Sequence, residues 1–121
     1  MKEMTKAEEE IMQVLWRLEK GFVKELLAEL DEPKPAYNTV STIVRILEKK
    51  GFVAYNAFGK THQYYPLISK EDYKSQISKN LVSNYFGGSV ESLVSFFAKK
   101  EEINIEELDD ILKQLKSKKN G

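Results

Sequence analysis

Side chains that can bind nucleic acid gather between residues 37 and 62 of this sequence. Amides, hydroxyls and cations with helical spacing can bond to base edges and to phosphates. The residues of this kind are Tyr37, Asn38, Thr39, Ser41, Thr42, Arg45 and Lys49. Two further candidates, Lys60 and His62, follow Gly59. Lys60 suits a phosphate contact, whereas His62 fits a solvated cross-strand position at least as well as a place against DNA.

An ordinary solvated helix face is the alternative interpretation of the first group. Such a face is normally richer in Glu and Lys. Two threonines in one short helix also need a reason, because β-branched residues are mediocre helix formers. We therefore favour recognition of bases over a purely solvated face.

The charges are distributed unevenly along the chain. Its 121 residues have 19 basic and 19 acidic side chains, and the formal net charge is zero. Residues 1–33 carry a net charge of −4, residues 34–66 carry +4, and the remainder is neutral. A basic middle third indicates an anionic partner if its charges share one surface, and an ordinary basic face if they do not.

The composition excludes several classes of protein. The chain has no Cys and one His, so disulfides, thiolate metal sites and multi-His metal sites are excluded. We find no nucleophile–base pair and no phosphate-binding glycine loop. The carboxylate pairs Glu101-Glu102 and Asp109-Asp110 point apart on a helix. We therefore expect no enzyme activity, no metal and no cofactor.

Apolar periodicity predicts three helices in the first third of the chain. A capping box of Thr5 and Glu8 begins the first helix, and Gly21 is expected to end it. The second helix follows and stops near Pro33. The third runs from about residue 37 to 50 and is closed by Gly51. Trp16 lies off the main apolar stripe and is expected to pack against the hairpin or the C-terminal half.

The period then changes from helical to strand-like. Residues 52–58 and 61–66 are rich in aromatic side chains and flank Gly59-Lys60, which predicts a β-hairpin. Tyr64 and Tyr65 lie on opposite faces of their strand, so one of them is expected in the core. Ile46 either contacts a thymine methyl or belongs to the peripheral core, and we favour the core.

The last 55 residues are predicted to form three helices. The first begins at Ser69 and breaks at Gly87-Gly88, and Asn104 caps the last. Their apolar stripes exceed what 55 residues can bury easily. We favour burial against a second copy of the chain over packing on the same chain's N-terminal half. The expected dimerisation residues are Leu81, Tyr85, Leu93, Phe96, Phe97, Leu108, Ile111 and Leu115.

Together these elements predict a mainly α-helical fold with a minor β component. Residues 1–68 form a winged helix-turn-helix DNA-binding domain, and residues 69–121 form a helical dimerisation region. In this fold the third helix enters the major groove of double-stranded DNA. The hairpin is the wing.

Four stretches resemble the penicillinase-repressor family. Residues 39–53 resemble its recognition-helix signature, and residues 7–16 are similar to its first helix. Residues 64–67 are similar to the end of its wing, and residues 87–97 resemble its dimerisation region. The resemblance implies a homodimeric transcriptional repressor that binds a palindromic operator.

The resemblance also implies a mode of regulation, found in the family's antibiotic-resistance systems. A membrane-bound sensor with a metalloprotease domain triggers cleavage within the dimerisation helices, and alignment places the bond at Phe96–Phe97. Here Phe96 replaces the family's Asn before that bond. The family often has a basic residue where Ser41 stands and an Arg where Ile46 stands; here Arg45 lies one position earlier. The absence of Cys excludes copper sensing by the family's cysteine motif.

Two other functions remain open at this stage. A winged helix can serve as a protein-interaction module, and a small-molecule-responsive regulator would need a pocket between the domains. No apolar run is long enough to span a membrane, and the N-terminus lacks the apolar stretch of a signal peptide. We expect no membrane insertion and a cytoplasmic location.

Overall fold

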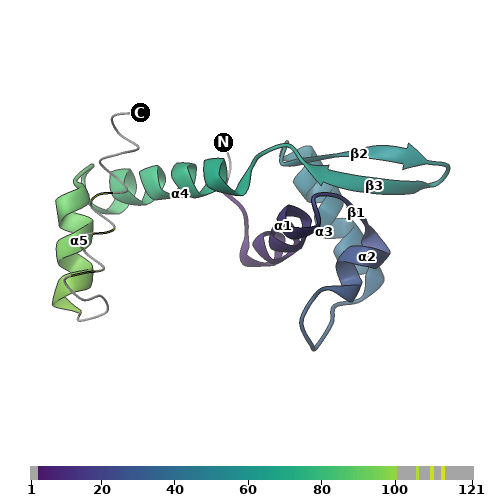
Figure 1. The fold of residues 1–121 in the computed structure, drawn as a ribbon, viewed down its shortest axis with the longest axis horizontal. Coiled ribbons are helices and arrows are strands. Elements are labelled where there is room, and N and C mark those ends of the chain that lie inside the picture. Colours follow the sequence, from purple (N-terminus) through teal and green to yellow (C-terminus); the bar gives the residue numbers. More distant parts are fainter. Residues whose placement is uncertain (1–2, 101–105, 107–109, 111–112, 114–121) are drawn as a thin grey trace. The chain divides into compact units, whose positions relative to one another are not determined.

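The fold is described by a computed structural model that covers residues 3–100 together with residues 106, 110 and 113. The chain divides into two compact units, Met1–Lys74 and Ser75–Gly121, which are described separately. Within the described residues, no helix has both the length and the apolar character that a membrane span requires. Figure 1 labels the helices and strands.

Helix α1 (Lys6–Leu18) begins with the predicted capping box. The Thr5 hydroxyl accepts from the Glu8 backbone N–H at 3.2 Å, and the Glu8 carboxylate accepts from the Thr5 N–H at 3.0 Å. The helix ends before Gly21, its predicted end. Glu19 takes the left-handed turn, with φ of 73°, and its N–H bonds the carbonyl of Leu15 at 2.7 Å.

Gly21 instead begins a short strand that the sequence did not predict. Strands β1 (Gly21–Phe22), β2 (Val53–Phe58) and β3 (Thr61–Pro66) form an antiparallel sheet in the order β1-β3-β2. Gly21 is paired with Tyr64. A Cβ atom at Gly21 would lie 3.1 Å from Cδ2 of Leu26, so a larger residue would press on helix α2.

Helices α2 (Val23–Ala28) and α3 (Tyr37–Lys49) pack on α1 and form the core of the first unit. The central residues of their apolar stripes are fully buried, whereas Leu27 and Ile43 are half-buried. Leu26, Val40, Val44 and Leu47 each have no exposed surface. The predicted span of α3 and both predicted strands of the hairpin agree with the structure to within a residue or two.

The β2–β3 hairpin forms the wing. Figure 1 shows it extending beyond the helices of the first unit. Tyr64 is buried and Tyr65 is half-buried, as the alternation along β3 predicts. Three helices followed by this hairpin constitute a winged helix, so the predicted fold class, mainly α-helical with minor β, is confirmed.

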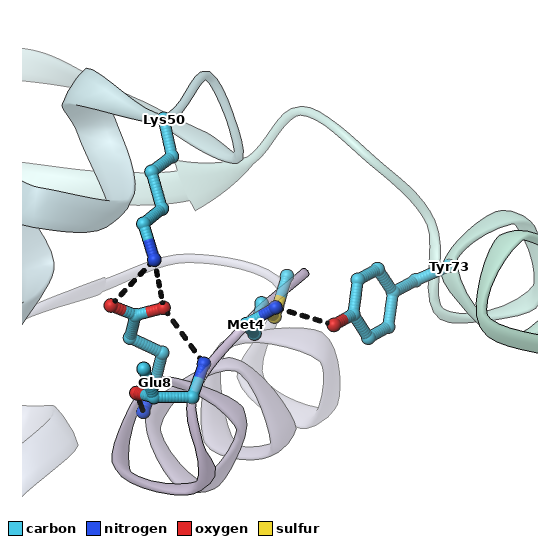
Figure 2. Close-up of polar contacts among 5 residues, drawn as sticks. Met4, Glu8, Lys50 and Tyr73 are labelled. Carbon is cyan, nitrogen blue, oxygen red and sulfur yellow. Dashed lines mark hydrogen bonds and ion pairs between the residues drawn. The ribbon is translucent and has the colours of Figure 1, made fainter. Parts of the chain in front are cut away.

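Tyr73, in the first turn of helix α4 (Lys70–Tyr85), completes the core of the first unit. Its hydroxyl accepts from the Met4 N–H at 2.8 Å (Figure 2). Its ring lies 6.0 Å from that of Trp16 and 5.8 Å from that of Phe52. The Trp16 indole donates to the carbonyl of Ile68 at 2.9 Å. Trp16 therefore packs where the sequence predicted.

The second unit holds the rest of α4 and helix α5 (Val90–Lys99). Gly87 and Gly88 separate the two helices, and both have positive φ. Ser89 caps α5 by accepting from the Ser92 N–H at 3.1 Å. The cap predicted at Asn104 lies outside the described residues.

Candidate nucleic-acid interface

The turn between α2 and α3 sets the position of α3, and Lys34 closes this turn. Its ammonium group donates to the carbonyl of Leu27 at 3.3 Å, of Ala28 at 3.0 Å and of Leu30 at 2.5 Å. The last carbonyls of a helix lack partners within the helix and carry partial negative charge. Lys34 therefore stabilises the end of α2 rather than adding a free cation to the surface.

Helix α3 buries one face and exposes the other. Val40, Val44 and Leu47 point into the core. The predicted DNA-binding residues lie on the remaining surface. Asn38, Thr39, Thr42, Arg45 and Lys49 are exposed, Ser41 is half-buried, and Tyr37 is 50% exposed.

Two short hydrogen bonds organise this outer face. Arg45 Nη2 donates to Ser41 Oγ at 3.0 Å, which draws the guanidinium toward the helix N-terminus. Thr42 Oγ1 donates to the carbonyl of Asn38 at 2.8 Å. Its hydroxyl proton is thus used within the helix.

The wing carries the other two candidates. Gly59, with φ of 64°, forms the turn, and Lys60 beside it is exposed. His62 is half-buried, and its ring stacks on Tyr55 with centroids 3.9 Å apart and planes 7° apart. His62 thus occupies a cross-strand position, with one face of its ring covered by Tyr55.

Lys50 is removed from the basic surface by a buried ion pair. Its ammonium lies 2.8 and 3.1 Å from the two carboxylate oxygens of Glu8, which is 4% exposed (Figure 2). Burial alone would raise the pKa of Glu8. The hydrogen bonds from Lys50 and Thr5 and the charge of Lys50 outweigh burial and hold the pKa below its ordinary value of 4.5.

Of the five cations in residues 34–66, three remain for an anionic partner. Arg45, Lys49 and Lys60 are exposed and form no ion pair with any described residue. Two lie on α3 and one on the wing turn. The cations of the middle third that have neither an ion pair nor a bond to a helix end therefore lie on these two elements.

Tyr64 connects the wing to α3 electrostatically. Burial raises the pKa of its hydroxyl, the charge of Glu48 raises it further, and the charge of Arg45 opposes the rise. Both charged residues belong to α3.

Three exposed apolar side chains near this surface were missed or misplaced by the sequence analysis. Ile46, expected in the peripheral core, is 39% exposed. Tyr55 is 37% and Phe58 is 57% exposed on the wing, and the Phe58 ring packs edge-on against Phe22 at 5.7 Å. Tyr55 and Phe58 lie on opposite faces of β2, and residues 55–58 are all exposed, so simple alternation along the strand does not predict this exposure. Nor does the apolar stripe of α3 reveal which helix residue stays uncovered.

An acidic cleft of about 430 Å³ lies on another part of the first unit. It is bounded by α1, the end of α2 and the turn that follows. Its lining includes Glu10, Arg17, Glu29, Asp31 and Glu32, and an ion pair of 3.3 Å joins Arg17 to Glu29. Among the described residues, no group of His, Cys, Asp or Glu side chains is arranged to hold a metal ion.

The predicted dimerisation residues lie in the second unit. Tyr85 is 78% exposed, Phe96 46% and Leu81 37%, while Leu93 and Phe97 are half-buried. None of the residues of α5 is buried. Leu108, Ile111 and Leu115 lie outside the described residues.

Aromatic side chains cluster within this unit. The Phe96 ring lies 5.7 Å from Phe86 and 5.7 Å from Phe97, in edge-on arrangements. The Lys100 ammonium lies 5.7 Å from the centre of the Phe96 ring. Phe96 thus retains an exposed apolar surface although it already has three neighbours.

Comparison with known proteins matches nearly the whole chain to repressors. A family model described as penicillinase repressor matches residues 4–117. The "Methicillin resistance regulatory protein MecI" of Staphylococcus aureus (strain N315) is 30% identical over 117 residues, covering 96% of this chain and 95% of that protein. A "Penicillinase repressor" of Staphylococcus aureus is 31% identical over 120 residues, with 96% and 95% covered.

A more distant relative and a solved structure agree with these matches. A "Penicillinase repressor" of Bacillus licheniformis is 26% identical over 119 residues, covering 98% of this chain and 93% of that protein. The solution structure of the DNA binding domain of the repressor BlaI matches 60% of this chain and 94% of its own length. Its TM-score is 0.51 and its sequence identity 30%. The chain described here belongs to the penicillinase repressor family.

Proposed function

We propose that this chain is a DNA-binding transcriptional repressor that acts as a homodimer on a palindromic operator. The observation that carries the proposal is the outer face of α3. Polar side chains and the free cations Arg45 and Lys49 lie there on a winged helix, with Lys60 on the adjacent wing. The relatives are named as repressors, and the matching solved structure is a DNA-binding domain.

In the proposed complex α3 lies in the major groove. Asn38, Thr42 and Arg45 face base edges, because side chains at this spacing share one side of the helix. Tyr37, Thr39, Ser41 and Lys49 flank them and contact the backbone or orient the central residues. On the wing, Lys60 contacts a phosphate and His62 lies beside it. Phosphate contacts provide affinity and register, and base contacts provide specificity.

Dimerisation supplies the second half-site contact. One winged helix presents three free cations on α3 and the wing turn, and a single winged helix of this kind binds DNA weakly. Two winged helices about 34 Å apart reach adjacent turns of the major groove. The exposed Leu81, Tyr85 and Phe96, together with Leu93 and Phe97, supply an apolar surface that a second copy would cover. Leu108, Ile111 and Leu115 are proposed to extend it.

Cleavage at Phe96–Phe97 provides a way to release the operator. This bond lies inside α5, and Phe96 is exposed. A cut there would divide the helix and remove part of the apolar surface, so dimer affinity would fall. The proposed trigger is a membrane sensor with a metalloprotease domain that acts on this chain indirectly.

Binding to DNA from upstream of the chain's own gene tests the proposal. Fluorescence anisotropy of the full chain is measured on that duplex and on an unrelated duplex of equal length, at two salt concentrations. Three cations per protomer predict a log–log salt slope of about −5 for two protomers. The Arg45→Ala variant is compared with Lys24→Ala, which removes an exposed cation from α2 instead.

The proposal expects tight, selective and salt-sensitive binding with two protomers per duplex. Arg45→Ala should weaken binding at least tenfold and leave the dimer intact, whereas Lys24→Ala should leave both unchanged. If Arg45→Ala and Lys24→Ala bind alike, α3 is not the reading helix. If neither duplex is bound at low salt, the chain is not a DNA-binding repressor and the winged helix serves a protein contact.

A further inference from the structure

We propose that Ile46 is a specificity-determining residue that contacts the C5-methyl group of a thymine in the operator. The inference rests on the proposed function. It assigns an apolar contact to the outer face of α3, where the other proposed DNA-binding residues are mostly polar. It concerns a residue that was expected in the core.

Ile46 is an exposed aliphatic residue of α3. Ile46 lies in α3 between Val44 and Leu47, which have no exposed surface, yet it keeps 39% of its own exposed. A large aliphatic side chain left in water at this point gains free energy when an apolar group covers it. The face that carries Ile46 is the one proposed to meet DNA.

Its neighbours on the helix also present methyl groups. Thr42 lies four residues before Ile46 and Thr39 seven residues before it, so the three side chains form one row. Both threonines are exposed. Thr42 uses its hydroxyl proton in a bond to the carbonyl of Asn38 at 2.8 Å, so toward DNA it offers a γ-methyl group and a hydrogen-bond acceptor but no donor.

The polar side chains lie on the other flank of the face. Arg45 donates to Ser41 at 3.0 Å, and this bond draws the guanidinium away from the row that contains Ile46. The outer face of α3 is thus divided into a hydrogen-bonding flank, with Ser41 and Arg45, and a methyl-bearing flank, with Thr39, Thr42 and Ile46.

The major groove offers one apolar group to such a flank. Among the four bases, only thymine displays a methyl group there, and aliphatic or threonine methyl contacts are its usual partners. A guanine or adenine edge would leave its polar atoms unpaired against Ile46, which is unfavourable. The chemistry of the flank therefore selects a thymine.

Replacement of thymine by deoxyuridine tests this contact directly, because it removes the methyl group and preserves base pairing. Binding sites are first selected from random duplexes with the full chain. Each thymine of the selected half-site is then replaced in turn, and affinity is measured for the wild type, Ile46→Ala and Ile46→Val. Lys49→Ala, which removes a proposed phosphate contact, serves as the comparison variant.

At one thymine per half-site, the loss of the methyl group should weaken wild-type binding about fourfold, the effect of one buried methyl group. Ile46→Ala should lose this sensitivity and Ile46→Val should keep part of it. Lys49→Ala should bind all duplexes more weakly and remain sensitive. The thermal unfolding midpoint of each variant confirms that the fold is intact.

One result would overturn the inference separately from the proposed function. If Ile46→Ala retains the wild-type ratio of affinities for the thymine and deoxyuridine duplexes at every thymine, Ile46 is removed from base recognition while the chain still binds its operator. If no sequence is enriched in the selection, the proposed function fails and this inference fails with it.

Discussion

Replacing Lys50 by Met should destabilise the first unit by about 2–3 kcal/mol at neutral pH. The substitution keeps the length of the side chain and removes its charge, which leaves the carboxylate of Glu8 buried. Breaking a buried ion pair from one side costs about 3–5 kcal/mol. Two features reduce the cost: the Lys50 side chain is 21% exposed, and Glu8 still accepts from the Thr5 N–H at 3.0 Å.

The stability lost in Lys50→Met should depend on pH in a defined direction. The pKa of Glu8 lies below 4.5 in the folded chain, so its ionisation stabilises the fold above that value. This contribution disappears as the pH falls through the lowered pKa. Without Lys50, burial dominates and the ionised form of Glu8 becomes unfavourable. The difference in unfolding free energy between the wild type and Lys50→Met should therefore be widest near pH 7 and should shrink as the pH falls below 4.5.

Urea unfolding followed by the fluorescence of Trp16 measures this difference. Trp16 is the one tryptophan of the chain, and its indole bonds to the carbonyl of Ile68 within the first unit. The control is Lys74→Met, which breaks an exposed pair with Glu71 and should cost less than about 0.5 kcal/mol. An equally small cost for Lys50→Met, or a gap that does not change with pH, would refute the reasoning.

Three further changes have definite expected outcomes. Lys34→Met should lower the free energy of unfolding by about 1 kcal/mol, because three carbonyls at the end of α2 lose their cation, whereas Lys24→Met should change it little. Gly51→Ala should cost about 1–2 kcal/mol in the same urea assay, from backbone strain at φ of 86° with no steric clash. Tyr85→Asp, at a 78% exposed site, should shift sedimentation toward the monomer; an unchanged dimer would place the interface elsewhere.

The helices and the wing were predictable because their patterns are local. A capping box at Thr5, the apolar stripe of α3 and the aromatic run before Gly59 each lie within a few residues of one another. Strand β1 was not predictable in this way. It has two residues, and its partner around Tyr64 lies more than 40 residues later, so no local period marks it.

The candidate site shows the same division between local and distant information. The spacing of Asn38, Thr42 and Arg45 predicts a shared outer face, and they share one. The sequence counts Lys34 and Lys50 as free positive charges. Lys34 keeps its charge but donates to carbonyl groups at the end of α2 and just beyond it, and Lys50 is paired with Glu8, 42 residues away.

Ile46 shows a related limit of prediction from sequence. Its place at the edge of the apolar stripe does not reveal how far neighbouring elements cover it. Only the packing of α3 against its neighbours leaves it 39% exposed.

Photo-cross-linking tests the central claim most directly. p-Benzoylphenylalanine replaces either Tyr37, at the start of α3, or Tyr85, near the end of α4; both are exposed aromatic residues. The full chain is irradiated in complex with a selected duplex. The probe at position 37 should cross-link to DNA, and the probe at position 85 should cross-link to a second copy of the chain. A complex that forms normally but gives no DNA cross-link from position 37 would contradict the assignment of α3 as the reading helix.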